Sequence, residues 1–322
     1  MSTNKDLWLN AIRSQKALEE RYIRREIAIN INHKVDHPII LTSTSDWHLG
    51  SPYTDHEKLF GDLEEITSYS PEYVRVILAG DLIDNFPQKF RSAEAPARAL
   101  INPELQRNLL EEIVQEVIEY IDLSTWGNHD VEFDEKNMGF SDVARFMKKK
   151  VPFFHGKGFV VFKIGEQKYT MHLSHHLKGS SVYHDLQGPI RAWIETHSDI
   201  VVCGHTHSPA YMLDFKGQDE RGSVGQRVLM KLGTYKIGAD TYSDRYFKRG
   251  VPGNNTLVLF NDRKKILPFL EFSDAVQYLG IEKKKKILPK KKPVKKNTSK
   301  RSTSRTTKKT TTATSRKKST VK

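Results

Sequence analysis

The sequence predicts an α/β protein, an α/β/α layered sandwich with mixed central sheets. In the first half of the 322 residues, short apolar runs typical of strands alternate with stretches whose apolar residues recur at helical spacing. In the second half, strand-like runs dominate. Alternating strands and helices are typical of helices packed on a largely parallel sheet, and the additional strands make the expected sheets mixed.

The first half has seven expected elements. In order they are an amphipathic helix over 5–28, a strand over 38–44, a helix over 56–69, a strand over 72–79, a helix over 102–120, a strand over 121–126 and a helix over 141–150. Asn102 can cap the 102–120 helix, Pro103 suits its first turn, and Ser141 starts the last helix.

The two longer helices of the first half each have a candidate buried face. The residues in register are Leu59, Phe60, Leu63 and Ile66 in the first, and Leu105, Leu109, Ile113 and Val117 in the second. In the second half we expect a hairpin of two strands within 158–176, a helix over 188–197, and strands over 199–203, 227–235, 255–261 and 264–272.

The chain divides into three expected parts: an N-terminal amphipathic helical segment (1–36), the α/β domain (37–275) and a basic tail (276–322). The net charge of +13 belongs to the tail, because Lys283 to Lys322 contains 18 Lys or Arg and no Asp or Glu. The other 282 residues carry 34 basic and 39 acidic residues. With almost nothing to bury, the tail is expected to be disordered. We expect it to bind nucleic acid, with an import signal or an acidic protein partner as alternatives.

Composition predicts an intracellular protein. Cys203 is the only cysteine, so a disulfide within the chain is impossible. No apolar run approaches the roughly 20 residues that span a bilayer, and the N-terminus lacks the apolar core of a secretory signal. We therefore expect no membrane partner and a place in the cytoplasm, or in the host cytoplasm or nucleus if the chain is viral. The oligomeric state stays open.

Five expected strands end in polar residues. These ends are “DWH” from Asp46, “GDLID” from Gly80, “GNHD” from Gly127, “HH” at His175 and “GHTH” from Gly204. Any one of them alone is also typical of a turn. In open α/β sheets, however, strand ends gather along one crevice, where ligands bind. Carboxylate, imidazole and amide groups suit Mn²⁺, Fe or Zn²⁺, and no set of thiolates indicates a closed zinc site. The five ends together predict a metal centre.

In this order, the motifs resemble those of the calcineurin-like metallophosphoesterase superfamily, over about residues 40–235. The stretch “HHLKGSSVYHDLQGPIR”, followed by “GHTH” and “LGTYK”, is most similar to phage and viral members, some of them described as repair-exonuclease-like. The resemblance implies a phosphoesterase with two divalent metal ions as cofactors. Manganese is the first expectation, and iron, zinc and nickel are alternatives.

The resemblance also implies roles for individual residues. The implied ligands are Asp46, His48 and His207 for the first metal, Asp81 for both metals, and Asn128, His175 and His205 for the second. Water between the cations loses a proton and attacks the phosphorus in line. His129 stands beside the metals as general acid for the leaving group, and Asp84 can orient its imidazole.

Several assignments stay open. The superfamily more often has His-Gly at the fourth motif, where this chain has His175-His176. We assign the ligand to His175 because the residues after it then fit the viral-type pattern; without the resemblance, His172 would compete. Lys178 and His184, in the loop that follows, are candidate substrate-binding residues. Lys231 and Lys236, which flank “LGTY”, are further candidates for phosphate contact.

The leading hypothesis is a dinuclear metal-dependent phosphodiesterase acting on nucleic acid. Asn85 stands where protein Ser/Thr phosphatases of the superfamily carry Arg, which argues against a phosphoprotein substrate. One alternative is a small-molecule phosphatase or cyclic-nucleotide phosphodiesterase with the same site. The other is an inactive nucleic-acid-binding protein, which the complete set of predicted ligands disfavours.

Overall fold

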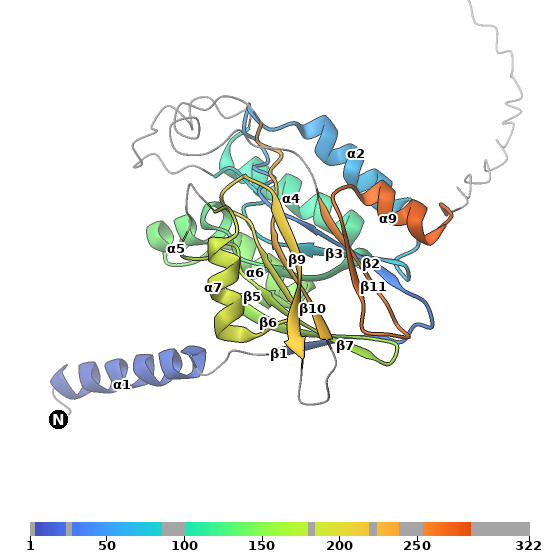
Figure 1. Ribbon diagram of the computed structural model, residues 1–322. Coiled ribbons are helices and arrows are strands. Elements are labelled where there is room, and N and C mark those ends of the chain that lie inside the picture. The colour runs from blue at the N-terminus through green and yellow to red at the C-terminus, as the bar shows by residue number, and fades with distance from the viewer. Residues whose placement is uncertain are drawn as a thin grey trace, which may run out of the picture. The chain divides into compact units, whose positions relative to one another are not determined.

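Two six-stranded sheets form the centre of the fold (Figure 1). The first contains, in spatial order, β1 (Ala28–His33), β6 (Gly158–Ile164), β7 (Gln167–Leu173), β8 (Ile200–Cys203), β10 (Val224–Lys231) and β9 (Ala210–Gln218). The second contains β12 (Ile266–Phe269), β11 (Asn255–Leu259), β2 (Ile39–Thr44), β3 (Val74–Leu78), β4 (Ile121–Thr125) and β5 (Phe153–Phe154). Each sheet combines parallel and antiparallel pairs, which confirms the predicted mixed sandwich.

The computed structural model describes residues 4–23, 28–85, 101–179, 184–218, 224–237 and 254–284. The described helices are α1 (Asn4–Ile23), α2 (His56–Thr67), α4 (Pro103–Val117), a 3₁₀ turn (Ile118–Tyr120), a π-helical turn (Asn128–Glu132), α5 (Phe133–Met138), α6 (Asp142–Lys150), α7 (Gln187–Thr196) and α9 (Phe272–Leu279). From 285 onward the predicted basic tail lies outside the described residues, but residues 276–279, which were assigned to it, are part of helix α9. Within the described residues, no helix is both long enough and apolar enough to cross a membrane.

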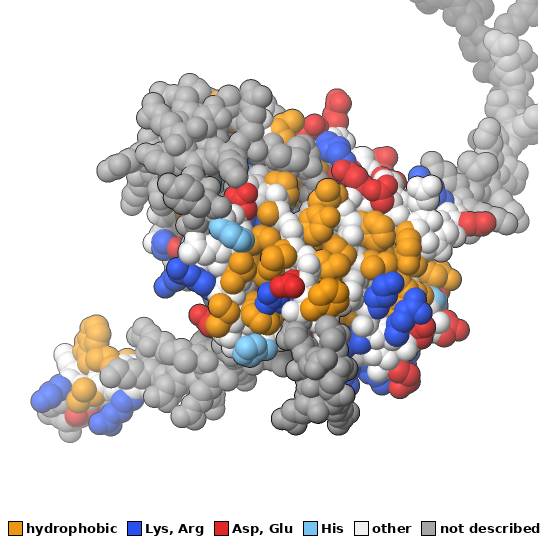
Figure 2. Space-filling model, viewed as in Figure 1, with side chains coloured by type: hydrophobic (Ala, Val, Ile, Leu, Met, Phe, Trp, Pro, Cys, Tyr) orange, Lys and Arg blue, Asp and Glu red, His pale blue; other side chains and the backbone are white. Residues whose placement is uncertain are grey.

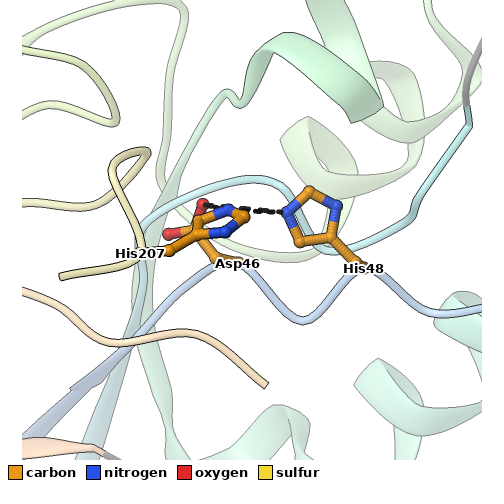
Figure 3. A group of neighbouring side chains, drawn as sticks. All are labelled: Asp46, His48 and His207. Carbon is orange, nitrogen blue, oxygen red and sulfur yellow. Dashed lines mark hydrogen bonds and ion pairs between the residues drawn. The ribbon is translucent and has the colours of Figure 1, made fainter. Parts of the chain in front are cut away.

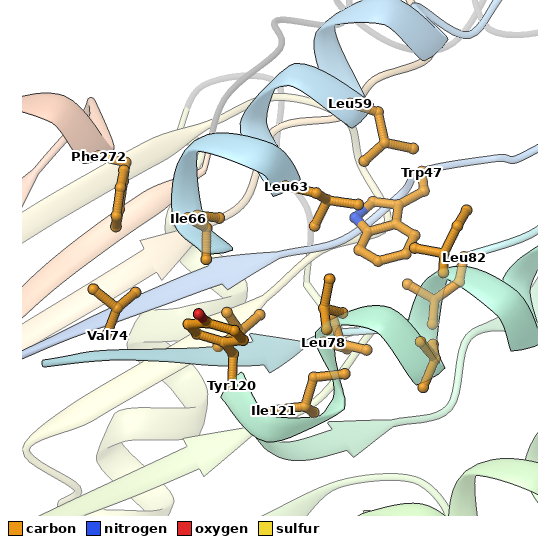
Figure 4. Packing of buried hydrophobic residues seen from close by; sticks show 14 of the residues in the cluster. Trp47, Leu59, Leu63, Ile66, Val74, Leu78, Leu82, Tyr120, Ile121 and Phe272 are labelled. Atoms are coloured by element: carbon orange, nitrogen blue, oxygen red, sulfur yellow. The ribbon is translucent and has the colours of Figure 1, made fainter. Parts of the chain in front are cut away.

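One apolar core lies between the sheets and two lie under the helices. Strand β2 shows the division, since Ile39 and Leu41 belong to the core between the sheets while Ile40 faces the helices. A strand buried on both faces is expected to be apolar throughout, as in parallel sheets with helical cover. The core under α2, α4 and α9 includes Trp47, which is fully buried and donates from Nε1 to Thr44 Oγ1 at 2.8 Å (Figure 4). Helix α7 covers the opposite face.

Capping was predicted correctly, and the buried face of α4 was predicted in part, since Ile113 and Val117 are buried as expected. Asn102 accepts a hydrogen bond from Leu105 N, and Ser141 accepts one from Ala144 N. Leu105 is half exposed, however, while Leu110 and Val114 are buried. A strict four-residue spacing turns by about 40° per step around an α-helix, so it drifts off the buried face. In α2, Phe60 is likewise exposed and only Leu59, Leu63 and Ile66 are buried.

Several elements differ from expectation. The N-terminal helix ends at Ile23, and Ala28, which was assigned to it, begins β1, a strand parallel to β6. Strands β5 and β9 and helices α5 and α9 were not predicted either. Tyr211, Leu213 and Phe215 are exposed on edge strand β9, and Figure 2 shows hydrophobic side chains gathered over the face that presents β9 and β11. These three residues lie on one face of β9, and Ala210 and Met212 lie on the other, so this part of the strand lacks the alternation of apolar and polar residues that marks a half-buried strand.

Candidate metal centre

The polar strand ends converge because the strands that carry them are parallel. Strand β2 pairs in parallel with β3 and β3 with β4, so their carboxyl ends lie on one edge. Strands β7 and β8 are also parallel. A hydrogen bond from His175 Nδ1 to Ala79 O (2.7 Å) joins the end of β7 to the end of β3. The two sheets therefore deliver their motifs to a common edge, as predicted.

The backbone at this edge is strained. Five residues predicted to bind metal have a positive φ: Asp46 (52°), His48 (47°), Asp81 (54°), His205 (73°) and His207 (58°). The left-handed region costs about 1–3 kcal/mol for a residue with a side chain, and such strain clusters at functional sites. The fold thus holds these side chains in directions that an ordinary backbone would not give them.

Two glycines allow the motif loops to approach each other. A Cβ added to Gly127 would lie 2.0 Å from Asp81 N and 2.3 Å from Asp81 Oδ1. A Cβ added to Gly204 would lie 2.6 Å from Asp46 Oδ2. Both clashes involve backbone or a buried carboxylate, which cannot move aside. The glycines of “GNHD” and “GHTH” are therefore required by contact with the two predicted carboxylate ligands.

The first group consists of Asp46, His48 and His207 (Figure 3). Asp46 Oδ1 lies 3.3 Å from His207 Nε2 and 3.9 Å from His48 Nε2, and the two Nε2 atoms are 3.1 Å apart. Asp46 Oδ1 is buried, and the groups that face it are the imidazoles of His207 and His48. Three ligand-type atoms thus converge on one point, one of them a buried carboxylate oxygen. This arrangement fits a divalent cation.

The second group consists of Asp81, His175 and His205, with Asn128 between the imidazoles. His175 Nε2 lies 3.1 Å from Asp81 Oδ2 and 3.2 Å from Asn128 Oδ1. His205 Nδ1 lies 2.9 Å from the same amide oxygen. Because a carbonyl oxygen only accepts, His175 Nδ1 carries the hydrogen donated to Ala79 O, and its Nε2 is the ligand atom. This donor set of nitrogen and oxygen also fits a divalent cation.

Burial and charge set the pKa values of these residues. Burial raises the pKa of Asp46, but the hydrogen bond with His207 and the charge of His175 outweigh it and bring it to about 2. Burial lowers the pKa of His175, but Asp81 and Asp46 raise it to about 10. Burial holds the pKa of both His48 and His205 at about 4. The centre therefore has ionised carboxylates, and a proton on His175 is held in place by their negative charge.

His129 lies against both groups. Its main-chain N–H donates to Asp81 Oδ1 at 2.9 Å, and its ring meets the His48 ring edge-on at 4.6 Å between centroids. His48, Asp81 and His129 also form a third set of converging ligand-type atoms. His129 Nδ1 contacts the main-chain carbonyl oxygen of Asp84 at 2.5 Å. The Asp84 carboxylate lies against His48 and Lys236 and also interacts electrostatically with His129. The hydrogen bond between Asp84 and His129 thus comes from the Asp84 backbone.

Sequence reasoning missed residues that hold the motif loops together. The buried Asp130 carboxylate accepts from Gly127 N (2.7 Å) and Leu82 N (2.9 Å), which ties the “GNHD” loop to the “GDLID” loop. Burial and the charge of Asp81 raise the pKa of Asp130 to about 7. Asn85 Nδ2 donates to His129 O at 2.9 Å. Both residues lie in or next to the motifs, but the sequence did not indicate that their side chains form hydrogen bonds with main-chain groups of the neighbouring loop.

The remaining candidates lie apart from these groups. His172, the alternative ligand, is buried on β7 and packs against Phe159. Lys178 and His184 are exposed, and His184 Nδ1 accepts from Leu186 N at 3.2 Å. His176 is exposed, and its ring lies 4.4 Å from that of His205. The substrate-binding roles of Lys178 and His184 stay predictions.

Comparison with known proteins identifies the family. The model of the calcineurin-like phosphoesterase family matches residues 41–209, more than half of the chain, and the chain belongs to this family. A search of curated protein sequences found no match.

Several solved structures match most of this chain at low sequence identity. Vps29 from Cryptosporidium parvum is 14% identical, with a TM-score of 0.38 over 73% of this chain and 100% of that one. A Zn²⁺ complex of Vps29 from Entamoeba histolytica is 12% identical, with a TM-score of 0.35 over 72% of this chain and 97% of that one. A predicted phosphoesterase from Streptococcus pneumoniae is 13% identical, with a TM-score of 0.33 over 73% and 98%.

Proposed function

We propose that this chain is a dinuclear metal-dependent phosphodiesterase that acts on nucleic acid. The observation that carries the proposal is the pair of adjacent Asp/His groups, each with a buried carboxylate, at one strand edge. Asp46, His48 and His207 would hold the first cation, Asn128, His175 and His205 would hold the second, and Asp81 would serve both. Two divalent cations bound there would supply the charge that polarises the phosphoryl oxygens, lowers the pKa of water and stabilises an in-line displacement.

His129 acts as the general acid in this proposal. Its Nδ1 contacts a main-chain carbonyl, which only accepts, so Nδ1 carries a hydrogen and Nε2 is the nitrogen that exchanges a proton. Nε2 lies 4.0 Å from Asp81 Oδ2, beside both groups. The leaving alkoxide of a phosphodiester needs a proton, and a positioned imidazole supplies about 10²–10⁴-fold in rate.

The basic tail supports a nucleic-acid substrate. Its 18 positive charges suit a polyanion, whereas the rest of the chain is slightly acidic. Deleting residues 285–322 should lower affinity for long DNA and RNA alike, because binding to phosphates carries no base information. The slope of log affinity against log salt concentration should become shallower, by about 0.7–0.9 for each phosphate that the protein no longer neutralises. Hydrolysis of a small phosphodiester should continue unchanged.

One panel of substrates tests the proposal. Purified protein with Mn²⁺, and separately with Fe²⁺, Zn²⁺ or Ni²⁺, is assayed on single-stranded DNA, duplex DNA, RNA and a chromogenic phosphodiester. We expect hydrolysis of nucleic acid as well as of the chromogenic substrate. Turnover confined to phosphate monoesters or to small cyclic nucleotides would support the small-molecule alternative. Binding without turnover under every metal would support an inactive binding protein.

A further inference from the structure

Lys236 is a buried lysine at the edge of the candidate metal centre. It follows β10, and only 7% of its surface is exposed. Its ammonium donates to Asp84 Oδ1 at 3.3 Å, and Asp84 is itself only 3% exposed. Burying two charges costs several kcal/mol each before their attraction is counted, so a pair of this kind is weak evidence for stability. The position of the pair beside His48 indicates a role in the candidate metal centre rather than in stability.

The same carboxylate oxygen also faces His48. Asp84 Oδ1 lies 3.2 Å from His48 Nδ1. The other ring nitrogen, Nε2, points toward Asp46 and His207, the remaining members of the first group. A line of three side chains thus leads from Lys236 through Asp84 to His48. In metal sites, a carboxylate on the far nitrogen of a histidine fixes its tautomer and ring orientation.

The backbone anchors Lys236 to the peptide that carries the first carboxylate. Tyr235 N donates to Asp46 O at 3.1 Å, and Thr234 Oγ1 donates to the same oxygen at 2.9 Å. Lys236 N in turn donates to Thr234 Oγ1 at 3.0 Å. Lys236 is therefore held at a fixed place relative to Asp46, unlike a lysine on the surface.

We propose that Lys236 is a positioning residue for the first metal site. It holds the Asp84 carboxylate where that carboxylate fixes His48 Nδ1, so that His48 Nε2 is presented to the cation. The inference rests on the proposed function, since it takes the first group to bind a metal. It also means that Lys236 acts on the Asp84 carboxylate and does not bind the phosphate of the substrate.

The second group has no need of Lys236. His175 Nδ1 donates to the main-chain carbonyl of Ala79, so backbone rather than a side chain fixes its orientation. Removing the Lys236 ammonium should therefore weaken one metal-binding step and spare the other. Lys231 offers a matched control, because it is equally buried in the same segment but donates to Asp185 O at 3.1 Å.

The test is Mn²⁺ titration of the full-length, metal-free protein by calorimetry, with Lys236→Met, Lys236→Arg and Lys231→Met beside the wild type. For Lys236→Met we expect one of two binding steps to weaken about 10–100-fold, the usual effect of removing an outer partner of a metal ligand. Lys236→Arg should restore most of that affinity, and Lys231→Met should bind like the wild type. Circular dichroism establishes that each variant is folded.

Asp84→Asn provides a second route if Lys236→Met does not fold. It should weaken the same step, and combining it with Lys236→Arg should weaken that step no further, because the two residues act through one interaction. Unchanged affinities in both Lys236→Met and Asp84→Asn would overturn the inference. If Lys236→Met instead keeps both affinities and raises KM for the chromogenic phosphodiester, Lys236 contacts substrate. A wild type that binds fewer than two Mn²⁺ contradicts the dinuclear function itself, while the effect of Lys236→Met on the remaining step still tests the inference.

Discussion

The two halves of the candidate metal centre hold their buried histidines in different ways. In the first group, His48 Nδ1 faces the carboxylate of Asp84, which is paired with Lys236. In the second, His175 Nδ1 donates to the backbone of Ala79. A substitution can replace a side chain but cannot remove a backbone carbonyl. The orientation of His48 can therefore be changed by substitutions at Asp84 or Lys236, whereas the orientation of His175 is fixed by the fold.

The halves also differ in charge. The pKa of His48 is lowered to about 4 by burial, so its imidazole is neutral at pH 7. The pKa of His175 is raised to about 10 because Asp81 and Asp46 outweigh the effect of burial. A cation entering the first group meets a neutral imidazole, while one entering the second displaces a proton. Metal binding to the second half should therefore strengthen more with rising pH.

The largest expected effect comes from breaking the carboxylate that joins the two halves. Asp81→Asn should lower Mn²⁺ stoichiometry and reduce kcat on a phosphodiester by about 10³-fold, because the metals supply several kcal/mol of transition-state stabilisation. Elemental analysis and steady-state kinetics measure both. Asp122 is a control, since it is a buried carboxylate that pairs with Arg75 at the other end of β4. Asp122→Asn should cost stability but keep the metals; equal metal loss in both variants would contradict the role of Asp81.

His129 lies between the halves, and its replacement should separate metal binding from proton transfer. His129→Ala should retain both metals but lose about 10²–10⁴-fold in kcat on substrates with poor leaving groups. A nitrophenolate leaving group needs no proton, so its release should suffer much less. Parallel kinetics on a dinucleotide and on bis(nitrophenyl) phosphate measure the difference. The same loss on both substrates would argue that His129 is a ligand or a structural residue.

The folding stability of the metal-free protein should depend on the second group at alkaline pH and on the first group at acid pH. His175 binds its proton more tightly in the folded state than at its ordinary pKa of 6.5, so its contribution to stability is complete below pH 6.5 and is lost as pH rises toward 10. His48 has a folded pKa of about 4, so stability is lost as pH falls from 6.5 through 4.

Denaturant unfolding of chelator-treated protein across pH checks this contrast. Relative to the wild type, His175→Gln should flatten the alkaline limb and His48→Gln should flatten the acid limb. Identical profiles for the two variants would remove the electrostatic distinction between the halves.

The smallest expected effect concerns backbone strain. At His207, where φ is 58°, glycine should give a free energy of unfolding about 1–2 kcal/mol higher than alanine in the metal-free protein, because a Cβ is unfavourable there. His175 is not among the residues with positive φ. Glycine at that position should therefore be the less stable choice, by about 0.5–1 kcal/mol. Thermal unfolding of His207→Gly, His207→Ala, His175→Gly and His175→Ala measures these differences. If glycine is the more stable choice at both positions, or alanine at both, backbone strain does not distinguish the two positions.

The sequence indicated which polar side chains meet at one edge because topology determines where strand ends lie. Asp46, Asp81 and Asn128 each follow a parallel strand, and parallel strands bring their carboxyl ends to one edge. The direction of Asp84 could not be predicted, since its carboxylate lies against His48 and Lys236, which come from distant parts of the chain. A motif gives the order of residues along a loop. It does not tell whether a side chain or its own carbonyl reaches the next residue.

The helices show a similar limit. Caps such as Asn102 were predictable because their hydrogen bonds are local. The buried face of α4 depends on which side of the helix meets the sheet, and the expected face included Leu105, whereas Leu110 is the residue that is buried. Helix α9 packs its Ala275 and Val276 into a core built by distant segments, and its eight residues are too few for a clear periodic signal.

The central claim is that the two halves bind one metal each. Anomalous scattering from crystals grown with Mn²⁺ tests it most directly. Two peaks are expected, one among Asp46, His48 and His207 and the other among Asn128, His175 and His205, with Asp81 reaching both. A single peak, or a peak coordinated by His129 in place of either group, would contradict the account.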